Sequence, residues 1–137
     1  MLEIGTGSGW TAALLSERVG AQNVTTVEVD PMLGMQAAER LKAAGCDCRV
    51  VIADGAEGWP AAAPYDRVHA TCAVPQIPRA WIEQTRPGGV IVAPYSPGFG
   101  CGALVRLDVL PDGTAMGRFA GSADFMVLRS QRPAGGP

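Results

Sequence analysis

The sequence has 137 residues, of which 47% are hydrophobic and 18% are charged, and its formal net charge is −2 at pH 7. This balance predicts one globular domain with its own core and excludes a disordered chain. The weak negative charge, the scattered arginines and the absence of a long apolar run or a signal peptide predict a cytoplasmic protein that binds neither nucleic acid nor membrane.

A strand and a helix are predicted at the start of the chain. Residues 2–4 predict the end of a buried strand, and residues 9–19 predict a helix that Gly20 terminates. The apolar residues that recur at helical spacing in this segment are Trp10, Leu14, Leu15 and Val19.

A second strand and a second helix follow. The β-branched stretch 23–29 predicts a buried strand, and Asp30 before Pro31 predicts the N-cap and first residue of a helix. This helix stops at Gly45, and residues 48–53 predict a third strand. The apolar face of the helix consists of Leu33, Ala37, Leu41 and Ala44.

The middle of the chain adds two more strands. Residues 56–65 are rich in Pro, Gly and Ala and predict a loop, whereas residues 66–71 predict a fourth strand. A short helix carries Trp81 and Ile82, and a Pro-Gly-Gly turn then leads into a fifth strand at 90–95. Strands that alternate with helices in this way form a parallel sheet with right-handed crossovers.

The last third of the chain changes character. Residues 104–110 and 114–119 flank a Pro-Asp-Gly turn and predict an antiparallel hairpin. Residues 125–129 are expected to continue or pair with that edge, and residues 131–137 are expected to form a disordered tail. The predicted fold is a doubly wound, Rossmann-like α/β domain over residues 1–130, with a mostly parallel sheet and an antiparallel C-terminal hairpin.

A glycine-rich loop, GTGSG at residues 5–9, joins the first predicted strand to the first helix. Glycines permit positive φ angles and a close approach to a ligand, and the N–H groups at a helix N-terminus favour an anion. In a dinucleotide site the third glycine lies one position later, and a small residue is needed where Trp10 stands. The loop therefore favours S-adenosylmethionine, which has a carboxylate in place of a pyrophosphate, over NAD.

Two acidic residues at predicted strand ends extend this site. Glu28 lies 19 residues after Gly9, where a carboxylate can accept hydrogen bonds from a ribose diol. Asp54 ends the third strand and can accept from an adenine amino group, while Gly55 leaves room for the ring. The alternatives without a ligand are an exposed loop carboxylate at Glu28 and an ordinary turn at Asp54.

The remaining candidates have less specific patterns. No metal site is expected, because there is one histidine and because the cysteines lack paired ligand spacing. These cysteines, expected to be free thiols, are Cys46, Cys48, Cys72 and Cys101. His69 is expected to pack, Cys72 and Pro75 either line the pocket or pack in a loop, and Trp59 and Trp81 are expected to cover the sheet.

Four blocks of the chain carry a family resemblance. They are LEIGTGSGWTAALL, TVEVDP, ADGAEGWPAAAPYDRVHATCAVPQIP and QTRPGGVIVAPY. In order and spacing they resemble the protein-L-isoaspartate O-methyltransferases, and the hairpin and the FMVLR segment fit the same family. The resemblance implies Glu28 at the ribose, Asp54 and Gly55 at the adenine, and residues 3–9 around the methionine moiety. The expected cofactor-binding residues are Glu3, Gly5, Thr6, Gly7, Ser8, Gly9, Glu28, Val29, Asp54 and Gly55.

Two departures from the family pattern bear on the substrate. The family has upstream helices and a loop with a hydroxyl residue that hold the isoaspartyl peptide, so we expect this chain to lack that part of the site. The block ATCAVPQIPRAW replaces an alanine-rich block of the repair enzymes. It resembles the related proteins that tailor ribosomal peptides in actinobacteria.

The resemblance implies an S-adenosylmethionine-dependent carboxyl O-methyltransferase acting on isoaspartyl or aspartyl residues of proteins or peptides. A carboxyl group with a pKa of about 3.9 is already an anion at pH 7 and needs no general base. Catalysis then depends on alignment of the reactants, and the sequence does not identify the catalytic residues. The alternatives are a cofactor-binding fragment that is inactive alone and a class I methyltransferase with another substrate.

Overall fold

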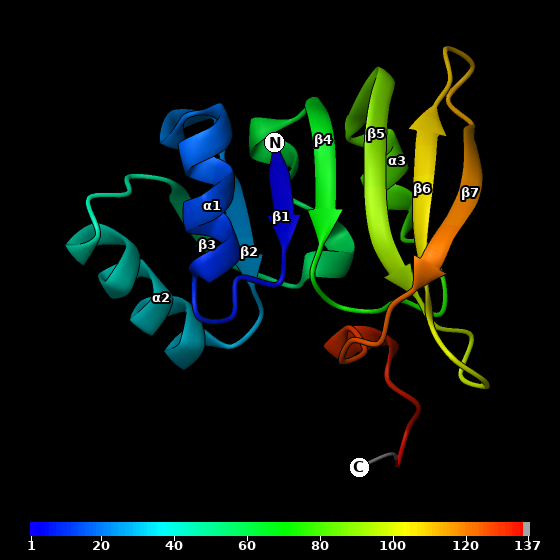
Figure 1. The fold of residues 1–137 in the computed structure, drawn as a ribbon. Coiled ribbons are helices and arrows are strands. Elements are labelled where there is room, and N and C mark those ends of the chain that lie inside the picture. The colour runs from blue at the N-terminus through cyan, green and yellow to red at the C-terminus, as the bar shows by residue number, and fades with distance from the viewer. Residues whose placement is uncertain (136–137) are drawn as a thin grey trace.

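A computed structural model describes residues 1–135 of the chain. Its seven strands form one sheet in the order β3-β2-β1-β4-β5-β6-β7 (Figure 1). The strands are Leu2–Ile4 (β1), Thr25–Glu28 (β2), Arg49–Ile52 (β3), Tyr65–Ala70 (β4), Thr85–Tyr95 (β5), Ala103–Val109 (β6) and Ala115–Ser122 (β7). The α-helices are Trp10–Val19 (α1), Pro31–Ala43 (α2) and Arg79–Glu83 (α3), and the 3₁₀ helices are Ala21–Asn23 (η1), Gly55–Glu57 (η2), Pro60–Ala62 (η3) and Arg129–Gln131 (η4).

The strand directions confirm the predicted fold class. Strands β1 to β5 run parallel to one another, β6 is antiparallel to β5, and β7 is antiparallel to β6. Helix α1 lies in front of the sheet in Figure 1, and α3 lies behind it. No helix of the described chain lies in front of β5 to β7 in this view.

The apolar core lies on the side of the sheet that faces α3. Leu2, Val68 and Ile91 are register partners on β1, β4 and β5, and none of them is more than 1% exposed. Trp81 of α3 is fully buried in this apolar core, and the partly buried Trp59 packs against the core. The prediction that these two tryptophans cover the sheet is confirmed.

Helix α1 packs mainly through small residues, and of the four apolar residues that predicted it only Leu15 is partly buried. Ala12 and Ser16 are buried, whereas Trp10, Leu14 and Val19 are 71%, 51% and 40% exposed. Small side chains let the helix backbone lie close to the sheet, so the larger side chains point away from it. The helical spacing therefore identified the helix but not its buried face.

Helix α2 follows the predicted pattern in part. Ala37 and Leu41 are buried, but Leu33 and Ala44 are exposed. The buried face instead includes Gly34, where a Cβ atom would lie 2.0 Å from Cδ1 of Ile52. The predicted N-cap is present, because the Asp30 side chain accepts hydrogen bonds from the N–H groups of Met32 and Leu33.

Two predicted boundaries are wrong for identifiable reasons. Residues 21–23 form η1, so β2 begins only at Thr25. The Pro-Gly-Gly segment lies inside β5 as a bulge, because the register shifts from Tyr65 opposite Thr85 to Arg67 opposite Val90. Gly88 provides the left-handed backbone of this bulge, with φ at 83°.

Trp81 should be a main source of stability. Its indole Nε1 donates a 2.8 Å hydrogen bond to the Gly55 carbonyl. Trp81→Phe leaves this buried acceptor unpaired and opens a cavity, so we expect the free energy of unfolding to fall by roughly 2–4 kcal/mol in urea titrations. Trp10→Phe is the matched control, and we expect a change below about 0.5 kcal/mol there. Equal effects of the two substitutions would contradict this assignment of the core.

Candidate functional site

The glycine-rich loop leaves β1 and is held by β2. The N–H groups of Gly5 and Thr6 donate to the carbonyl of Val27 at 2.9 and 3.2 Å. Gly5, Gly7 and Gly9 have φ angles of 93°, 55° and 89°, which residues with a side chain rarely adopt. The three glycines are therefore required by the path of the backbone between β1 and α1.

Glu28 joins this loop to the end of β2. Its Oε2 accepts from the Gly7 N–H at 2.9 Å, and its Oε1 accepts from the Asp30 N–H at 3.1 Å. The side chain is buried, so these two donors offset part of the cost of desolvating a carboxylate. Each oxygen retains a second lone pair with which it can accept from a ligand.

Glu3 lies in the interior below the loop. It is fully buried, and its Oε1 accepts a 2.6 Å hydrogen bond from the Thr26 hydroxyl, which is also 2.7 Å from the Thr6 hydroxyl. Its Oε2 has no hydrogen-bond partner among the described residues. Desolvation raises the pKa of the Glu3 carboxyl to about 7, and the bond from Thr26 offsets part of this rise.

Thr71 fixes the loop from the β4 side, and the sequence did not identify it. Its hydroxyl lies 2.6 Å from the Gly5 carbonyl and 3.1 Å from the Ile4 carbonyl. A Cβ atom at Gly5 would lie 2.7 Å from this hydroxyl oxygen, which is a second reason for glycine at that position. A Thr directly after a strand has no local pattern that marks this role.

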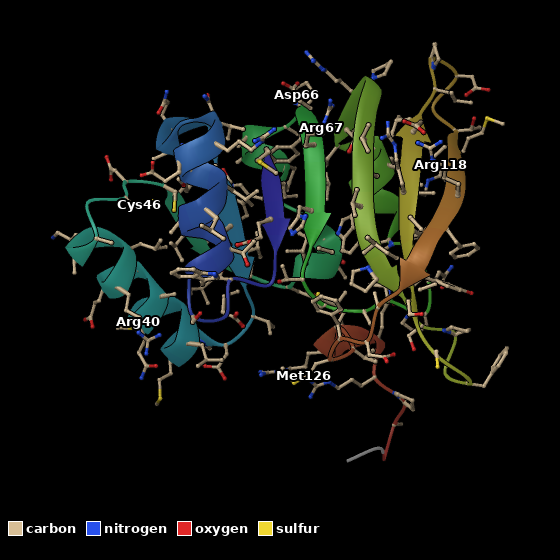
Figure 2. All side chains as sticks on the ribbon, in the orientation of Figure 1. Arg40, Cys46, Asp66, Arg67, Arg118 and Met126 are labelled. Carbon is tan, nitrogen blue, oxygen red and sulfur yellow. The ribbon has the colours of Figure 1, made fainter. Side chains whose placement is uncertain are left out.

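The segment 126–132, which we call the C-terminal strap, crosses the carboxyl ends of the central strands. Its N–H at Leu128 donates to the Ala73 carbonyl, and the Ala73 N–H donates to the Met126 carbonyl, both at 2.8 Å. Figure 2 shows Met126 below the sheet, away from the β6–β7 hairpin. The prediction that 125–129 pairs with the hairpin edge is therefore wrong, because Val127 forms its bridge with Ala73, beyond the end of β4.

The strap also contacts the end of β3 through Asp54. The Asp54 Oδ1 accepts from the Ala56 N–H at 2.9 Å and from the Ser130 hydroxyl at 3.0 Å. Gly55 is buried, and a Cβ atom there would lie 2.5 Å from Cγ2 of Ile4. Beyond Ser130, the side chain of Gln131 donates to the Gln76 carbonyl at 2.8 Å. The final two positions of the predicted tail, 136 and 137, lie outside the described residues.

A cavity of about 190 Å³ lies between the glycine-rich loop, the strand ends and the strap. Its lining consists of Ile4, Gly5, Gly7, Val27, Glu28, Val29, Leu33, Gly55, Thr71, Cys72, Met126, Val127, Leu128, Arg129 and Arg132. Five of the ten residues predicted to bind the cofactor are in this lining, and five strap residues that were not predicted join them.

The other five predicted site residues are not part of this lining. Glu3 and Thr6 are buried, Ser8 and Gly9 line a groove against α2, and Asp54 is held by Ser130. Cys72 lines the cavity, whereas Pro75 and His69 are not part of its lining. Desolvation raises the pKa of the Cys72 thiol to about 12, with a contribution from the Glu28 charge, so this thiol is protonated at neutral pH.

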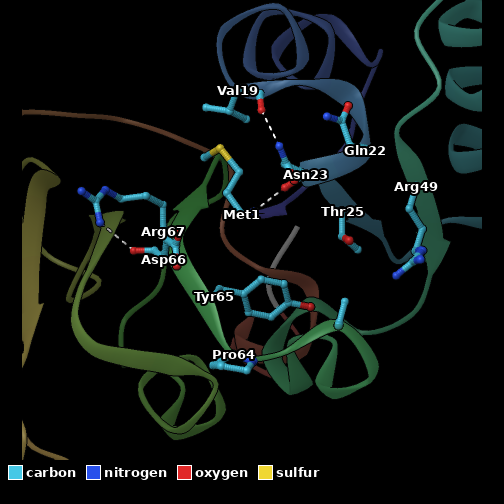
Figure 3. A pocket seen from close by; sticks show the side chains of 11 residues that line it. Met1, Val19, Gln22, Asn23, Thr25, Arg49, Pro64, Tyr65, Asp66 and Arg67 are labelled. Carbon is cyan, nitrogen blue, oxygen red and sulfur yellow. Dashed lines mark hydrogen bonds between the residues drawn. The ribbon is translucent and has the colours of Figure 1, made fainter.

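A larger cavity of about 550 Å³ lies at the opposite, amino end of the strands. Figure 3 shows Tyr65, Arg49 and Asp66 around it, with Met1 and Asn23 at its wall. Open α/β sheets bind ligands at the carboxyl ends of their strands, where helix N-termini also point. The smaller cavity at the carboxyl ends is therefore the candidate functional site.

Two further properties concern residues 1–135. No three His, Cys, Asp or Glu side chains of this segment are grouped so that they could hold a metal ion. No helix in it is both long and apolar enough to cross a membrane.

Comparison with known proteins identifies the family. The sequence model of the family described as protein-L-isoaspartate(D-aspartate) O-methyltransferase (PCMT) matches residues 1–132. The chain belongs to this family. It is 41% identical over 115 residues to a protein-L-isoaspartate O-methyltransferase of Ignicoccus hospitalis. The aligned region covers 82% of this chain and 54% of that protein. The chain thus spans about half the length of the curated relatives it matches.

Solved structures of the same family share the fold. A protein-L-isoaspartate O-methyltransferase superposes with a TM-score of 0.84 at 25% identity, over 92% of this chain and 40% of that chain. A PCMT protein of Plasmodium falciparum, solved with S-adenosyl-L-homocysteine, has a TM-score of 0.79 over 93% of this chain and 64% of its own. At 14% identity, the second likeness shows the fold alone. The family resemblance of the sequence blocks is confirmed.

The buried Glu3 carboxyl should make stability depend on pH. Its pKa is about 7 in the folded chain against 4.5 in the unfolded chain, so between these values the folded state retains a proton that the unfolded state releases. Stability should therefore fall as the pH rises from about 4.5 to 7, by on the order of 2 kcal/mol. In urea titrations at pH 5 and pH 8, Glu3→Gln should remove this part of the pH dependence. An unchanged pH dependence in Glu3→Gln would show that the carboxyl is ionised throughout.

Proposed function

We propose that this chain is the cofactor-binding part of an S-adenosylmethionine-dependent carboxyl O-methyltransferase that acts on isoaspartyl or aspartyl residues of proteins or peptides. The observation that carries the proposal is the Glu28 carboxylate, which is bonded to the glycine-rich loop and lines the cavity at the carboxyl ends of the strands. Family membership favours this chemistry over that of other class I methyltransferases.

Residues in and beside the cavity fit S-adenosylmethionine. Glu28 retains lone pairs for the ribose hydroxyls, and Asp54 has a second carboxylate oxygen for the adenine amino group. Gly5 and Gly7 line the cavity without side chains, so the backbone of the loop can approach the methionine end. The buried Oε2 of Glu3, which lacks a partner in the described chain, is an unpaired polar group beneath the loop.

The remaining chemistry requires no general base from the chain. When bound, S-adenosylmethionine supplies a methyl group on a positively charged sulfur. The substrate carboxyl is an anion at pH 7, and Cys72 stays protonated, so this thiol does not compete as a nucleophile. The task of the chain is then to align two reactants and exclude water, which the strap assists by covering the strand ends.

A second candidate is a cofactor-binding chain with no methyl transfer of its own. It is favoured by the face of the sheet in front of β5 to β7, which no helix of the described chain covers in Figure 1. In this case the chain would bind the cofactor but could not retain the peptide.

The two candidates differ in a pair of measurements on the 137-residue chain. Calorimetry should detect S-adenosylmethionine binding, and an isoaspartyl peptide should accept labelled methyl groups from it. The same assay with the matching aspartyl peptide tests whether the chain also methylates aspartyl residues. Binding without methyl transfer would support the second candidate. A chain that binds NAD and not S-adenosylhomocysteine would refute both.

Asp54→Asn tests the proposed adenine contact. The substitution keeps the Oδ1 acceptor for Ala56 and Ser130 but replaces the other oxygen by a donor, which would face the adenine amino group. We expect S-adenosylmethionine affinity to fall about tenfold or more in calorimetry. The control is Asp112→Asn in the hairpin turn, where Oδ1 likewise accepts from a backbone N–H and a hydroxyl, both of Thr114. Equal affinities of Asp54→Asn and wild type would place the adenine elsewhere.

The proposed partners and location follow from the same reasoning. The partner is a protein or peptide with an isoaspartyl or aspartyl residue, and no nucleic acid is involved. All four cysteines of the chain are free thiols, which is the normal state in a reducing compartment. We therefore propose a cytoplasmic location.

A further inference from the structure

The C-terminal strap places two arginines at the cavity. Both Arg129 and Arg132 line it, and both are exposed to solvent. They follow Leu128, which is buried in the core and bonded to Ala73, so the base of this segment is fixed. Guanidinium groups in such positions can bind carboxylates through paired N–H donors.

The charge of Arg129 is already paired. Its Nη2 lies 3.5 Å from Oδ2 of Asp30, while Oδ1 of Asp30 accepts from the first turn of α2. The hydrogen bond from the Leu33 N–H, together with other groups including Arg129, holds the pKa of Asp30 below its ordinary value. Arg129 therefore joins the strap to α2 and is not the first choice for a ligand.

Arg132 differs from Arg129 in its partners. Its Nε donates to the Val127 carbonyl at 3.1 Å, which holds the guanidinium near the cavity. No carboxylate of the described residues lies within 4.0 Å of this guanidinium. Its two terminal nitrogens are therefore available to a carboxylate from outside the chain.

The neighbouring charges explain the need for such a cation. Glu28 lines the cavity, and Asp54 is bonded to Ser130 of the strap outside the lining; both carboxylates disfavour the approach of an anionic substrate. Since Arg129 is matched by Asp30, Arg132 is the cation at this cavity that can offset them.

The chemistry of methyl transfer decides which carboxylate Arg132 can usefully bind. A carboxylate that attacks a sulfonium loses its negative charge as the C–O bond forms and the C–S bond breaks. A guanidinium bound to that carboxylate would stabilise the starting state more than the transition state and would slow the reaction. A second carboxylate, which keeps its charge throughout, can be bound without this cost.

We propose that Arg132 binds a second, unreactive carboxylate of the substrate, so that the site selects isoaspartyl peptides with an acidic residue beside the isoaspartyl residue. The proposal rests on the function proposed above and adds the class of peptide. Arg132 is in this sense a specificity residue, not a catalytic one.

The test compares two labelled peptides on the 137-residue chain. Both are short, blocked at their ends and fluorescein-labelled, and both have a central isoaspartyl residue, which glutamates flank in one and glutamines in the other. Fluorescence anisotropy measures their binding in the presence of saturating S-adenosylhomocysteine, whose own binding is first measured by calorimetry. We expect the wild type to bind the glutamate peptide about fivefold more tightly, with a difference that shrinks at high salt.

Two substitutions locate the source of this preference. Arg132→Gln should bind the two peptides equally, and Arg132→Lys should retain part of the preference. Arg118→Gln removes an exposed arginine from β7, which Figure 2 shows away from the strap, and should keep the full preference. Equal binding of both peptides to the wild type, or a preference that persists in Arg132→Gln, would overturn the role of Arg132 alone. Failure to bind either peptide while S-adenosylhomocysteine binds would overturn the proposed substrate and this inference with it.

Discussion

The Glu28 carboxylate is the contact on which the candidate site depends. One oxygen receives the Gly7 N–H of the loop after β1, and the other receives the Asp30 N–H at the start of α2. Asp30 then caps α2 and pairs with Arg129 of the strap. A single buried acid thus links the glycine-rich loop, the second helix and the C-terminal segment. Because it both holds this arrangement and lines the cavity, its structural role and its proposed ribose contact use the same two oxygens.

The site is formed by segments from the two ends of the chain. Residues 5–9 form one wall of the cavity, and the strap at 126–132 forms another. After β4, Thr71 bonds to the first wall through the Gly5 carbonyl, and Ala73 bonds to the second wall through the backbone of Met126 and Leu128. The end of β4 is therefore the place where the two segments are brought into contact. This explains why the strap, which has little regular structure of its own, follows a defined path over the strand ends.

The polar groups near the cavity are arranged for binding and not for proton transfer. Glu28 and Asp54 accept backbone N–H groups, the Cys72 thiol is protonated, and His69 is outside the cavity with its pKa lowered by desolvation. A nucleophile that is already an anion needs only position and a dry environment. Carboxyl methylation, the proposed reaction, therefore requires no acid–base pair from the cavity lining.

The sequence by itself determined the order of strands and helices, the hairpin, the glycine-rich loop and the acidic residues at Glu28 and Asp54. These features depend on local patterns: hydrophobic period, turn residues, and residues that directly follow a strand. The tertiary structure alone decided that α1 is buried through Ala12 and Ser16, and that the strap reaches Asp54 through Ser130. The physical reason is the distance along the chain, because 76 residues separate the partners of that last hydrogen bond. A contact of this kind depends on how the whole sheet brings its strand ends together, and no short pattern around either residue records it.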